Sequence, residues 1–281
     1  MPGATELVCG VRRWDLGHRG LVMGILNRTP DSFYDHGSYF AFDRFLAHAE
    51  RLVQEGADIL DVGGVKAGPG PEVSEEEELE RVVPAIAALA ERFDVALSVD
   101  TWKASVAAEA FAAGACIGND ISGFSDPAYL SAAAKAGAAV VATHIRLAPR
   151  VADPDPHYGD LWGDVSEFLA ERAGRACAAG IPPSSVILDA GLDLGKTSEQ
   201  SVRLLAATPQ LVAMGYPVLL SASNKTFLGS LVNREVGERG AASLAAATLG
   251  LAMGASILRV HDVAGTRRVC ATMAGLAAAR P

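Results

Sequence analysis

The sequence predicts a single-domain α/β protein with the (β/α)8 architecture of a TIM barrel. Three observations lead to this fold class. The chain has 281 residues, which is the usual size of one such barrel. Eight short runs are continuously apolar, as expected of parallel strands buried on both faces. Ala-rich segments with helical spacing separate these runs, and six of the segments end at a Gly that suits a helix C-terminus.

The predicted elements alternate regularly along the chain. The expected strands are Leu21–Asn27, Asp58–Val62, Ala96–Asp100, Ala115–Ile121, Ala138–Ile145, Ser185–Asp189, Pro217–Ser221 and Ser256–His261. The expected helices are Asp43–Gly56, Ser74–Arg92, Trp102–Gly114, Pro127–Gly137, Val165–Gly180, Ser198–Gly215, Arg239–Gly254 and Val263–Ala279. Segments 63–71 and 149–159 are rich in Gly and Pro, which predicts long loops. Residues 21–281 would form the barrel, and residues 1–20 an N-terminal extension or a first short hairpin.

The composition excludes several classes of protein and partner. Half of the residues are hydrophobic and 20% are charged, which excludes a disordered or fibrous chain. The net charge is −9, so we expect no nucleic acid and no membrane as a partner bound through bulk charge. The four Cys include no CxxC pair, so neither a disulfide framework nor a zinc knuckle is indicated. Residues 1–20 lack the apolar segment of a secretion signal, and no apolar run reaches the roughly 20 residues that span a bilayer. The expected location is therefore cytoplasmic.

A polar side chain stands at or just beyond the C-terminal end of each predicted strand. In a barrel these ends share one face, where active sites are built. Burying one such group unpaired costs about 1–3 kcal/mol, so eight of them at one end indicate a functional site. The groups are Asn27, Asp61, Asp100, Asn119, His144, Asp189, Ser221 with Lys225, and Arg259 with His261.

The strand-end residues form two chemical sets. Asn27, Arg259 and His261 would gather where the first and last strands meet, and they suit a phosphate or diphosphate with a divalent cation. The second set offers carboxylates and amides to the donor edge of a flat heterocycle, and one cation to an exocyclic carbonyl. It consists of Asp100, Asn119, Asp189 and Lys225.

Several segments resemble the motifs of dihydropteroate synthases in order and spacing. The first is MGILNRTPDSF at 23–33. It is followed by DVGG at 61–64, SVDT at 98–101, NDISG at 119–123, LGKT at 194–197 and RVHDV at 259–263. The resemblance runs from about residue 20 to the C-terminus. Any single segment is a weak signal, but the ordered set is specific.

The resemblance implies an enzyme that joins 6-hydroxymethyl-7,8-dihydropterin diphosphate to p-aminobenzoate, or to a different small aromatic amine, and releases diphosphate. In the family the diphosphate leaves first and the amine attacks a pterin-methyl cation. The residues that the resemblance assigns to the pterin are Asp100, Asn119, Asp189 and Lys225. Those that it assigns to the diphosphate are Asn27, Arg259 and His261, with Mg²⁺ as the cofactor on Asn27. The candidate catalytic residues are Lys225 and two loop carboxylates, Asp31 and Asp35, near the cation. A homodimer is also implied.

The sequence departs from the family mainly around the amine acceptor. The usual GESTRPG loop is GVKAGPG at 64–70, so Ala67 and Gly68 replace a Thr and an Arg, and Lys66 replaces a Ser. Leu194 replaces an aromatic wall of the same pocket, and Asn224 replaces an Arg. Elsewhere Thr143 replaces a Met, Asp193 replaces a Gly, and Arg28 replaces a small apolar residue. Losing a charge-assisted hydrogen bond to a substrate carboxylate costs roughly 1.5–3 kcal/mol, although Lys66 and Arg28 are candidates to restore some charge. We therefore expect poor use of p-aminobenzoate and poor binding of sulfonamides.

Two other functions remain open from the sequence. One is a non-catalytic or regulatory paralogue that binds pterin without turnover. The other is a pterin-dependent methyltransferase acting on a methylated folate, which Asp100 and Asn119 would also serve. The proposed diphosphate set favours the synthase type.

Several single residues have a structural interpretation beside the functional one. Asp61 and Asp100 are also compatible with helix N-caps, His144 is better explained as a structural residue, and Lys196 is equally compatible with a solvated position in a first helical turn. His18, His36, His48 and His157 lack partners at metal-ligand spacing.

Overall fold

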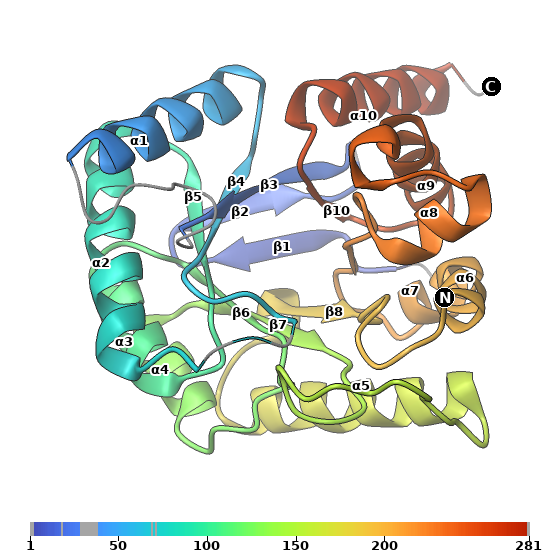
Figure 1. Cartoon of the computed structure of the whole chain (residues 1–281), viewed down its shortest axis with the longest axis horizontal. Helices are drawn as coiled ribbons and strands as arrows, with labels where there is room; N and C mark the ends of the chain where they lie inside the picture. Colours follow the sequence, from blue (N-terminus) through green and yellow to red (C-terminus); the bar gives the residue numbers. More distant parts are fainter. Residues whose placement is uncertain (1–2, 18, 29–38, 69, 71, 280–281) are drawn as a thin grey trace.

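The computed structural model describes residues 3–17, 19–28, 39–68, 70 and 72–279. Eight parallel strands form one sheet in the order β8-β7-β6-β5-β4-β3-β10-β9. A parallel bridge between Leu188 and Val218 joins the two ends of this sheet, and helices surround the strands (Figure 1). The predicted single-domain (β/α)8 barrel is confirmed.

The barrel strands lie close to their predicted positions. They are β3 Leu21–Asn27, β4 Ile59–Gly63, β5 Ala96–Asp100, β6 Ile117–Asp120, β7 Ala139–Thr143, β8 Val186–Asp189, β9 Leu219–Leu220 and β10 Ile257–Val260. The helices are α1 Tyr39–Gln54, α2 Glu75–Arg92, α3 Ala104–Ala112, α4 Tyr129–Ala136, α5 Leu161–Ala178, α6 Ser198–Ala206, α7 Thr208–Val212, α8 Thr226–Val232, α9 Gly240–Ala252 and α10 Val263–Ala278.

Alternate residues along each strand face opposite sides of the barrel wall, because successive side chains of a strand point in opposite directions. Val22, Leu60 and Val99 point outward and pack in the core beneath the helices. Met23 and Ile59 belong to a separate apolar cluster inside the barrel. The inward positions are thus apolar in the first half of the strands, and they become polar toward the C-terminal ends. Apolar side chains therefore fill the N-terminal end of the barrel, called the floor, and polar side chains line its C-terminal end, called the mouth.

A short hairpin closes the floor of the barrel. It consists of β1 Glu6–Cys9 and β2 Arg12–Asp15 in antiparallel register. Leu7 and Cys9 are fully buried and join the interior cluster. The Ser185 hydroxyl donates to the Val8 carbonyl at 2.7 Å, which ties the hairpin to the start of β8. The other end of the barrel stays free for a site.

The region between β8 and α9 differs from the prediction. The single helix expected over Ser198–Gly215 is two helices, α6 and α7, which meet at Ala207. Pro209 lies in the first turn of α7, and proline lacks the N–H that a continuous helix would need there. The short helix α8, just after Lys225, was not predicted, because seven residues are too few to show a helical period. None of the helices in the described part of the chain is long and apolar enough to span a membrane.

Candidate active site at the C-terminal mouth of the barrel

Strand register brings three predicted residues, Asn27, Asp100 and Asn119, to one level of the mouth. Asn27 pairs with Gly63, Gly63 with Asp100, and Asp100 with Asn119. A Cβ added at Gly63 would lie 3.4 Å from the Asp100 Cβ and 3.6 Å from the Asn27 Oδ1. The Asn27 amide and the Asp100 carboxylate thus lie on either side of Gly63.

Asp61 is the centre of the hydrogen-bond network in the mouth. Its carboxylate is fully buried and accepts from Ser98 Oγ at 2.5 Å, Asn119 Nδ2 at 3.0 Å and Arg259 Nε at 2.6 Å. The interpretation of Asp61 as a helix N-cap is therefore wrong. The sequence did not assign Asp61 or Ser98 to a ligand. Each stands two residues before the last residue of its strand, Gly63 or Asp100, so its side chain also points into the barrel.

Arg259 forms ion pairs with one carboxylate of β4 and one of β5. Its Nε contacts Asp61, and its Nη2 contacts the Asp100 Oδ2 at 2.6 Å. The sequence grouped Arg259 with Asn27 and His261 around a diphosphate. In the structure its guanidinium contacts Asp61 and Asp100, and its role in binding diphosphate stays a prediction. The side chain is long enough to pass β3, which lies between β10 and β4 in the sheet.

Burial and charge oppose each other in this cluster. Burial raises the pKa of Asp100 to about 7, the Arg259 cation acts to lower it, and the Asp61 carboxylate acts to raise it. Burial opposes the charge on Arg259, but the Asp61 and Asp100 carboxylates outweigh this effect and raise its pKa above the ordinary value. The cluster therefore holds Arg259 as a cation while Asp100 titrates near neutrality.

Asp100→Asn is expected to reduce the pH dependence of stability. The folded-state pKa of Asp100, about 7, exceeds the roughly 3.9 of an unfolded Asp. Between about pH 4 and pH 7 the folded protein therefore holds a proton that the unfolded chain has lost, and the wild-type free energy of unfolding falls as pH rises. Urea denaturation across this range should show a smaller fall in Asp100→Asn. Asp155→Asn, at an exposed position, should keep the wild-type slope; equal slopes in all three proteins would contradict the assignment.

Asp189 and Lys225 stand on the opposite side of the mouth. Burial raises the pKa of Asp189, which the Lys225 ammonium acts to lower. The Asp189 Oδ1 accepts from the Gly191 N–H at 2.8 Å, and the Lys225 Nζ donates to the Leu192 carbonyl at 2.6 Å. Asp189 thus accepts a hydrogen bond from the backbone that follows β8, and Lys225 donates one to it.

His261 is oriented by a serine that the sequence did not single out. Ser223 Oγ accepts from the His261 backbone N–H at 3.2 Å and lies 3.0 Å from His261 Nδ1. With the hydroxyl donating to Nδ1, the ring proton of neutral His261 is on Nε2. Partial desolvation and the Arg259 cation lower the pKa of His261. The side chain therefore offers a neutral N–H donor at the exposed rim of the mouth.

Three of the altered acceptor residues lie at the edge of a cavity of about 360 Å³. Ala67, Gly68 and Leu194 line it together with residues 145, 147, 148 and 150–154 of the β7–α5 loop. A Cβ added at Gly68 would meet no atom of the described residues within 4 Å. The Arg150 Nη1 donates to the Lys66 carbonyl at 3.2 Å, which joins this loop to the β4–α2 loop. The replacement of Thr and Arg at positions 67 and 68 thus coincides with open space.

The altered residues Lys66, Asn224 and Arg28 do not line this cavity, and other residues singled out from the sequence lie outside the described residues. The Lys66 side chain is exposed. Asn224 has a left-handed φ of 59°, and its N–H donates to Ser243 Oγ at 3.0 Å. The Arg28 guanidinium donates to the Arg81 carbonyl at 2.5 Å and stacks on Phe42, so it faces the helical layer. Asp31, Asp35, His18 and His36 lie outside the described residues.

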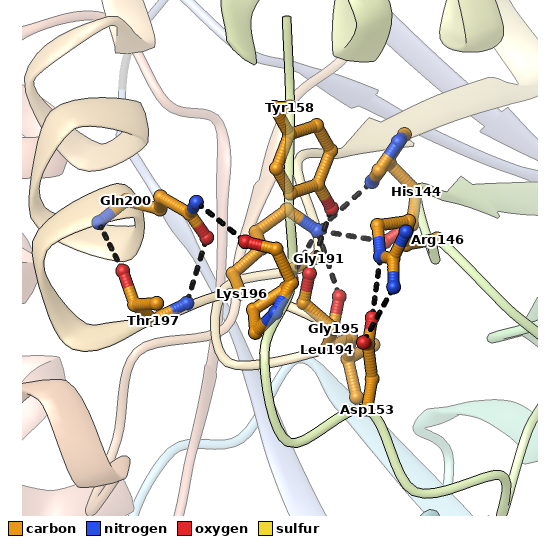
Figure 2. A network of polar contacts seen from close by, with 11 residues as sticks. His144, Arg146, Asp153, Tyr158, Gly191, Leu194, Gly195, Lys196, Thr197 and Gln200 are labelled. Atoms are coloured by element: carbon orange, nitrogen blue, oxygen red, sulfur yellow. Dashed lines mark hydrogen bonds and ion pairs between the residues drawn. The ribbon is translucent and has the colours of Figure 1, made fainter.

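Lys196 and His144 form a buried pair beside the mouth (Figure 2). Lys196 is only 8% exposed and His144 only 4%. The Lys196 Nζ lies 2.8 Å from the His144 Nδ1, and the imidazole ring meets Phe168 edge to face at 4.9 Å. The interpretation of Lys196 as a solvated first-turn lysine is therefore wrong. His144 is buried and packed, as expected of a structural residue.

Thr143→Val is expected to raise the free energy of unfolding by about 1 kcal/mol, because it removes a buried hydroxyl without changing the side chain's shape. Thr143 is 1% exposed, and its Oγ1 has no hydrogen-bond partner among the described residues. Thr101→Val is the matched control, because the Thr101 hydroxyl donates to the Glu78 Oε1 at 2.6 Å, and it should lower stability. Urea denaturation measures both, and destabilisation by Thr143→Val would show that the hydroxyl has a partner.

Comparisons with known proteins identify the family of this chain. The family described as "Pterin binding enzyme" matches residues 23–261. "Inactive dihydropteroate synthase 2" of Mycobacterium leprae is 43% identical over 98% of this chain and 96% of its own length. "Dihydropteroate synthase" of Escherichia coli K12 is 41% identical over 90% of this chain and 89% of its own. The Xanthomonas albilineans dihydropteroate synthase solved with 4-aminobenzoic acid is 40% identical, with a TM-score of 0.90 over 99% of this chain and 100% of that one.

Motifs, barrel and comparisons all point to one family. The polar groups of the family motifs converge at one end of a closed barrel. A relative named dihydropteroate synthase and one named inactive are about equally similar to this chain. The chain therefore belongs to the pterin-binding enzyme family, among the dihydropteroate synthases and their paralogues.

Proposed function

We propose that the protein binds 6-hydroxymethyl-7,8-dihydropterin diphosphate with Mg²⁺ and transfers the pterin-methyl group to an amine. The observation that supports this most directly is the buried polar cluster of Asp61, Asp100, Asn119 and Arg259 facing Asp189 and Lys225. Carboxylates and amides suit the amino and ring N–H groups of a pterin, and a lysine suits its carbonyl oxygen.

The reaction breaks one bond and forms one. The bond between the methylene carbon and the diphosphate oxygen breaks, and the amine nitrogen bonds to that carbon. Diphosphate leaves with the electron pair, and the amine loses a proton to solvent. The neutral Nε2–H of His261 at the rim is placed to donate to a diphosphate oxygen, and Lys225 and Asp189 would orient the ring. Asp31 and Asp35 are the proposed carboxylates beside the developing cation.

The donor set fits Mg²⁺ held largely by the substrate. The described residues include no cluster of three or more Asp, Glu, His or Cys side chains that could hold a metal. The Asn27 amide oxygen at the rim is a hard oxygen ligand, and Mg²⁺ commonly takes few protein ligands together with phosphate oxygens and water. When bound, Mg²⁺ would neutralise the charge on the departing diphosphate.

Calorimetric titration tests the proposed binding step. Pterin diphosphate with Mg²⁺ should bind saturably, and Asn119→Ala should weaken it, since the amide faces Asp61 at the centre of the cluster. Absence of binding at millimolar ligand would contradict the proposal. Diphosphate release with p-aminobenzoate and with other aromatic amines then tests transfer.

A pterin-binding protein without turnover is the second candidate. Ala67 and Gly68 favour it, because they lack the groups expected to hold the acceptor, and a similar relative is named inactive. Any amine-dependent release of diphosphate would exclude this candidate. Binding of methyltetrahydrofolate without Mg²⁺ would instead favour the methyltransferase alternative.

We propose that the protein forms a homodimer whose interface is made by α9 and α10. Leu249 of α9 and Leu276 of α10 are 49% and 61% exposed, and these two helices pack against each other. Sedimentation equilibrium should give twice the chain mass. In Leu249→Glu/Leu276→Glu the expected mass is that of one chain.

A further inference from the structure

The β8–α6 loop, residues 190–197, is built around the side chain of Lys196. The Lys196 Nζ lies 2.9 Å from the Gly191 carbonyl oxygen, 3.0 Å from that of Leu194 and 3.3 Å from that of His144, besides the contact with His144 Nδ1. Figure 2 shows the side chain reaching into the middle of these acceptors. Three carbonyl dipoles and one imidazole lone pair therefore point at one nitrogen in a buried place.

The loop could not adopt this shape without a buried donor. Converging carbonyl oxygens repel one another, and each loses hydrogen bonds to water on burial. The fit against β7 is also tight: Gly191 has a φ of 64°, and a Cβ there would lie 1.9 Å from the His144 carbonyl oxygen. The Lys196 ammonium thus supplies the hydrogen bonds that hold the loop against the end of β7.

The same loop supplies hydrogen bonds to both charged residues on this side of the mouth. The Gly191 N–H donates to Asp189, and the Leu192 carbonyl accepts from Lys225. The Asp193 carboxylate, farther along the loop, accepts from the Thr226 N–H at 2.5 Å at the start of α8. A shift of the loop backbone would therefore move Asp189 and Lys225 together.

We propose that Lys196 is a positioning residue for pterin binding: it fixes the β8–α6 loop, and through Gly191 and Leu192 the loop fixes Asp189 and Lys225. This inference rests on the proposed function. Lys196 does not reach the mouth itself, since its three N–H donors face the loop and His144.

The protonation states agree with this role. Burial and the Lys196 charge lower the pKa of His144 to about 3, so Nδ1 keeps its lone pair for Lys196. Burial lowers the pKa of Lys196 to about 7, with Asp189 and Asp193 opposing and Lys225 adding to that shift. Above pH 7 the neutral amine has two N–H donors for four acceptors, so the loop should loosen and pterin affinity should fall.

Lys196→Met tests the role, because methionine keeps the length of the side chain and removes its donors. Lys135→Met, on the exposed last turn of α4, is the matched control. We expect pterin diphosphate to bind at least tenfold more weakly to Lys196→Met, measured by calorimetry at a temperature where both variants are folded. The fall in affinity above pH 7 should be smaller in Lys196→Met than in the wild type.

Hydrogen exchange of the ligand-free protein separates this inference from the proposed function. Amides of residues 190–196 should exchange faster in Lys196→Met, while those of α5 stay protected and Lys135→Met matches the wild type. If wild-type protein binds no pterin, the proposed function fails, and exchange still tests the loop. If Lys196→Met does not fold, Lys196→Gln, with two N–H donors on a shorter arm, should show a smaller loss. Unchanged affinity and unchanged exchange in the folded variant would overturn the inference.

Discussion

Replacing Arg259 with Met is expected to lower the free energy of unfolding by about 3–5 kcal/mol, the usual cost of removing one partner from a buried ion pair. The guanidinium compensates Asp61, which is fully buried, and Asp100, which is 15% exposed. Without it two carboxylates face each other inside the mouth. Urea denaturation at pH 7 measures the change.

The pH dependence of Arg259→Met should also change. Loss of the cation raises the pKa of Asp100 further above its unfolded value, so the free energy of unfolding should keep falling as pH rises beyond 7. Adding Asp61→Asn to this variant removes the buried carboxylate that has lost its cation and should recover part of the stability. A double variant no more stable than Arg259→Met would show that charge is not the cause.

Arg267→Met is the matched control, because it breaks an ion pair at the opposite end of the barrel. Arg267 contacts Asp58 at 2.9 Å, but Arg19 contacts the same carboxylate at 2.7 Å. Asp58 would therefore keep one cation, and the expected loss of stability is smaller. Equal losses in the two variants would contradict a special role for Arg259.

The barrel could be predicted because its signal is repeated along the chain. Each buried parallel strand is a short apolar run, and the polar residue that ends it marks the C-terminal mouth. Asp100, Asn119 and Asp189 follow from this rule alone: Asp100 pairs with Asn119 near the ends of β5 and β6, and Asp189 pairs with Thr143 at the ends of β8 and β7. The break before Pro209 and the short helix α8 were missed, because neither gives a periodic signal.

The partners of long side chains could not be predicted in this way. The spacing along the chain fixes where the Arg259 side chain starts, but its guanidinium reaches Asp61 past one strand and Asp100 past two. Lys196 stands just before a helix, where a solvated lysine is ordinary, and only the closed shape of its loop shows that the ammonium is buried. Both outcomes depend on which carboxylates and carbonyls lack another partner in the folded chain.

Restoring the family residues in the β4–α2 loop should increase use of p-aminobenzoate. In Ala67→Thr/Gly68→Arg, diphosphate release that depends on p-aminobenzoate should rise about ten- to hundredfold, equivalent to roughly 1.5–3 kcal/mol for a charge-assisted hydrogen bond to its carboxylate. The described part of the structure has room for the change, because a Cβ at Gly68 would meet none of its atoms within 4 Å. Asn224 is left in place, because an arginine would be strained at its φ of 59°.

The matched control puts the same side chains on the other wall of the cavity. Ala148→Thr/Ala152→Arg adds a hydroxyl and a cation on the β7–α5 loop, which also lines the cavity, and should give no gain in release. Sulfonamides, which mimic p-aminobenzoate, should bind poorly to the wild type and more tightly to Ala67→Thr/Gly68→Arg. If that variant binds pterin diphosphate but shows no gain with p-aminobenzoate, the loop is not what limits the acceptor. If both double variants gain equally, added positive charge at the cavity is the cause, rather than the geometry of positions 67 and 68.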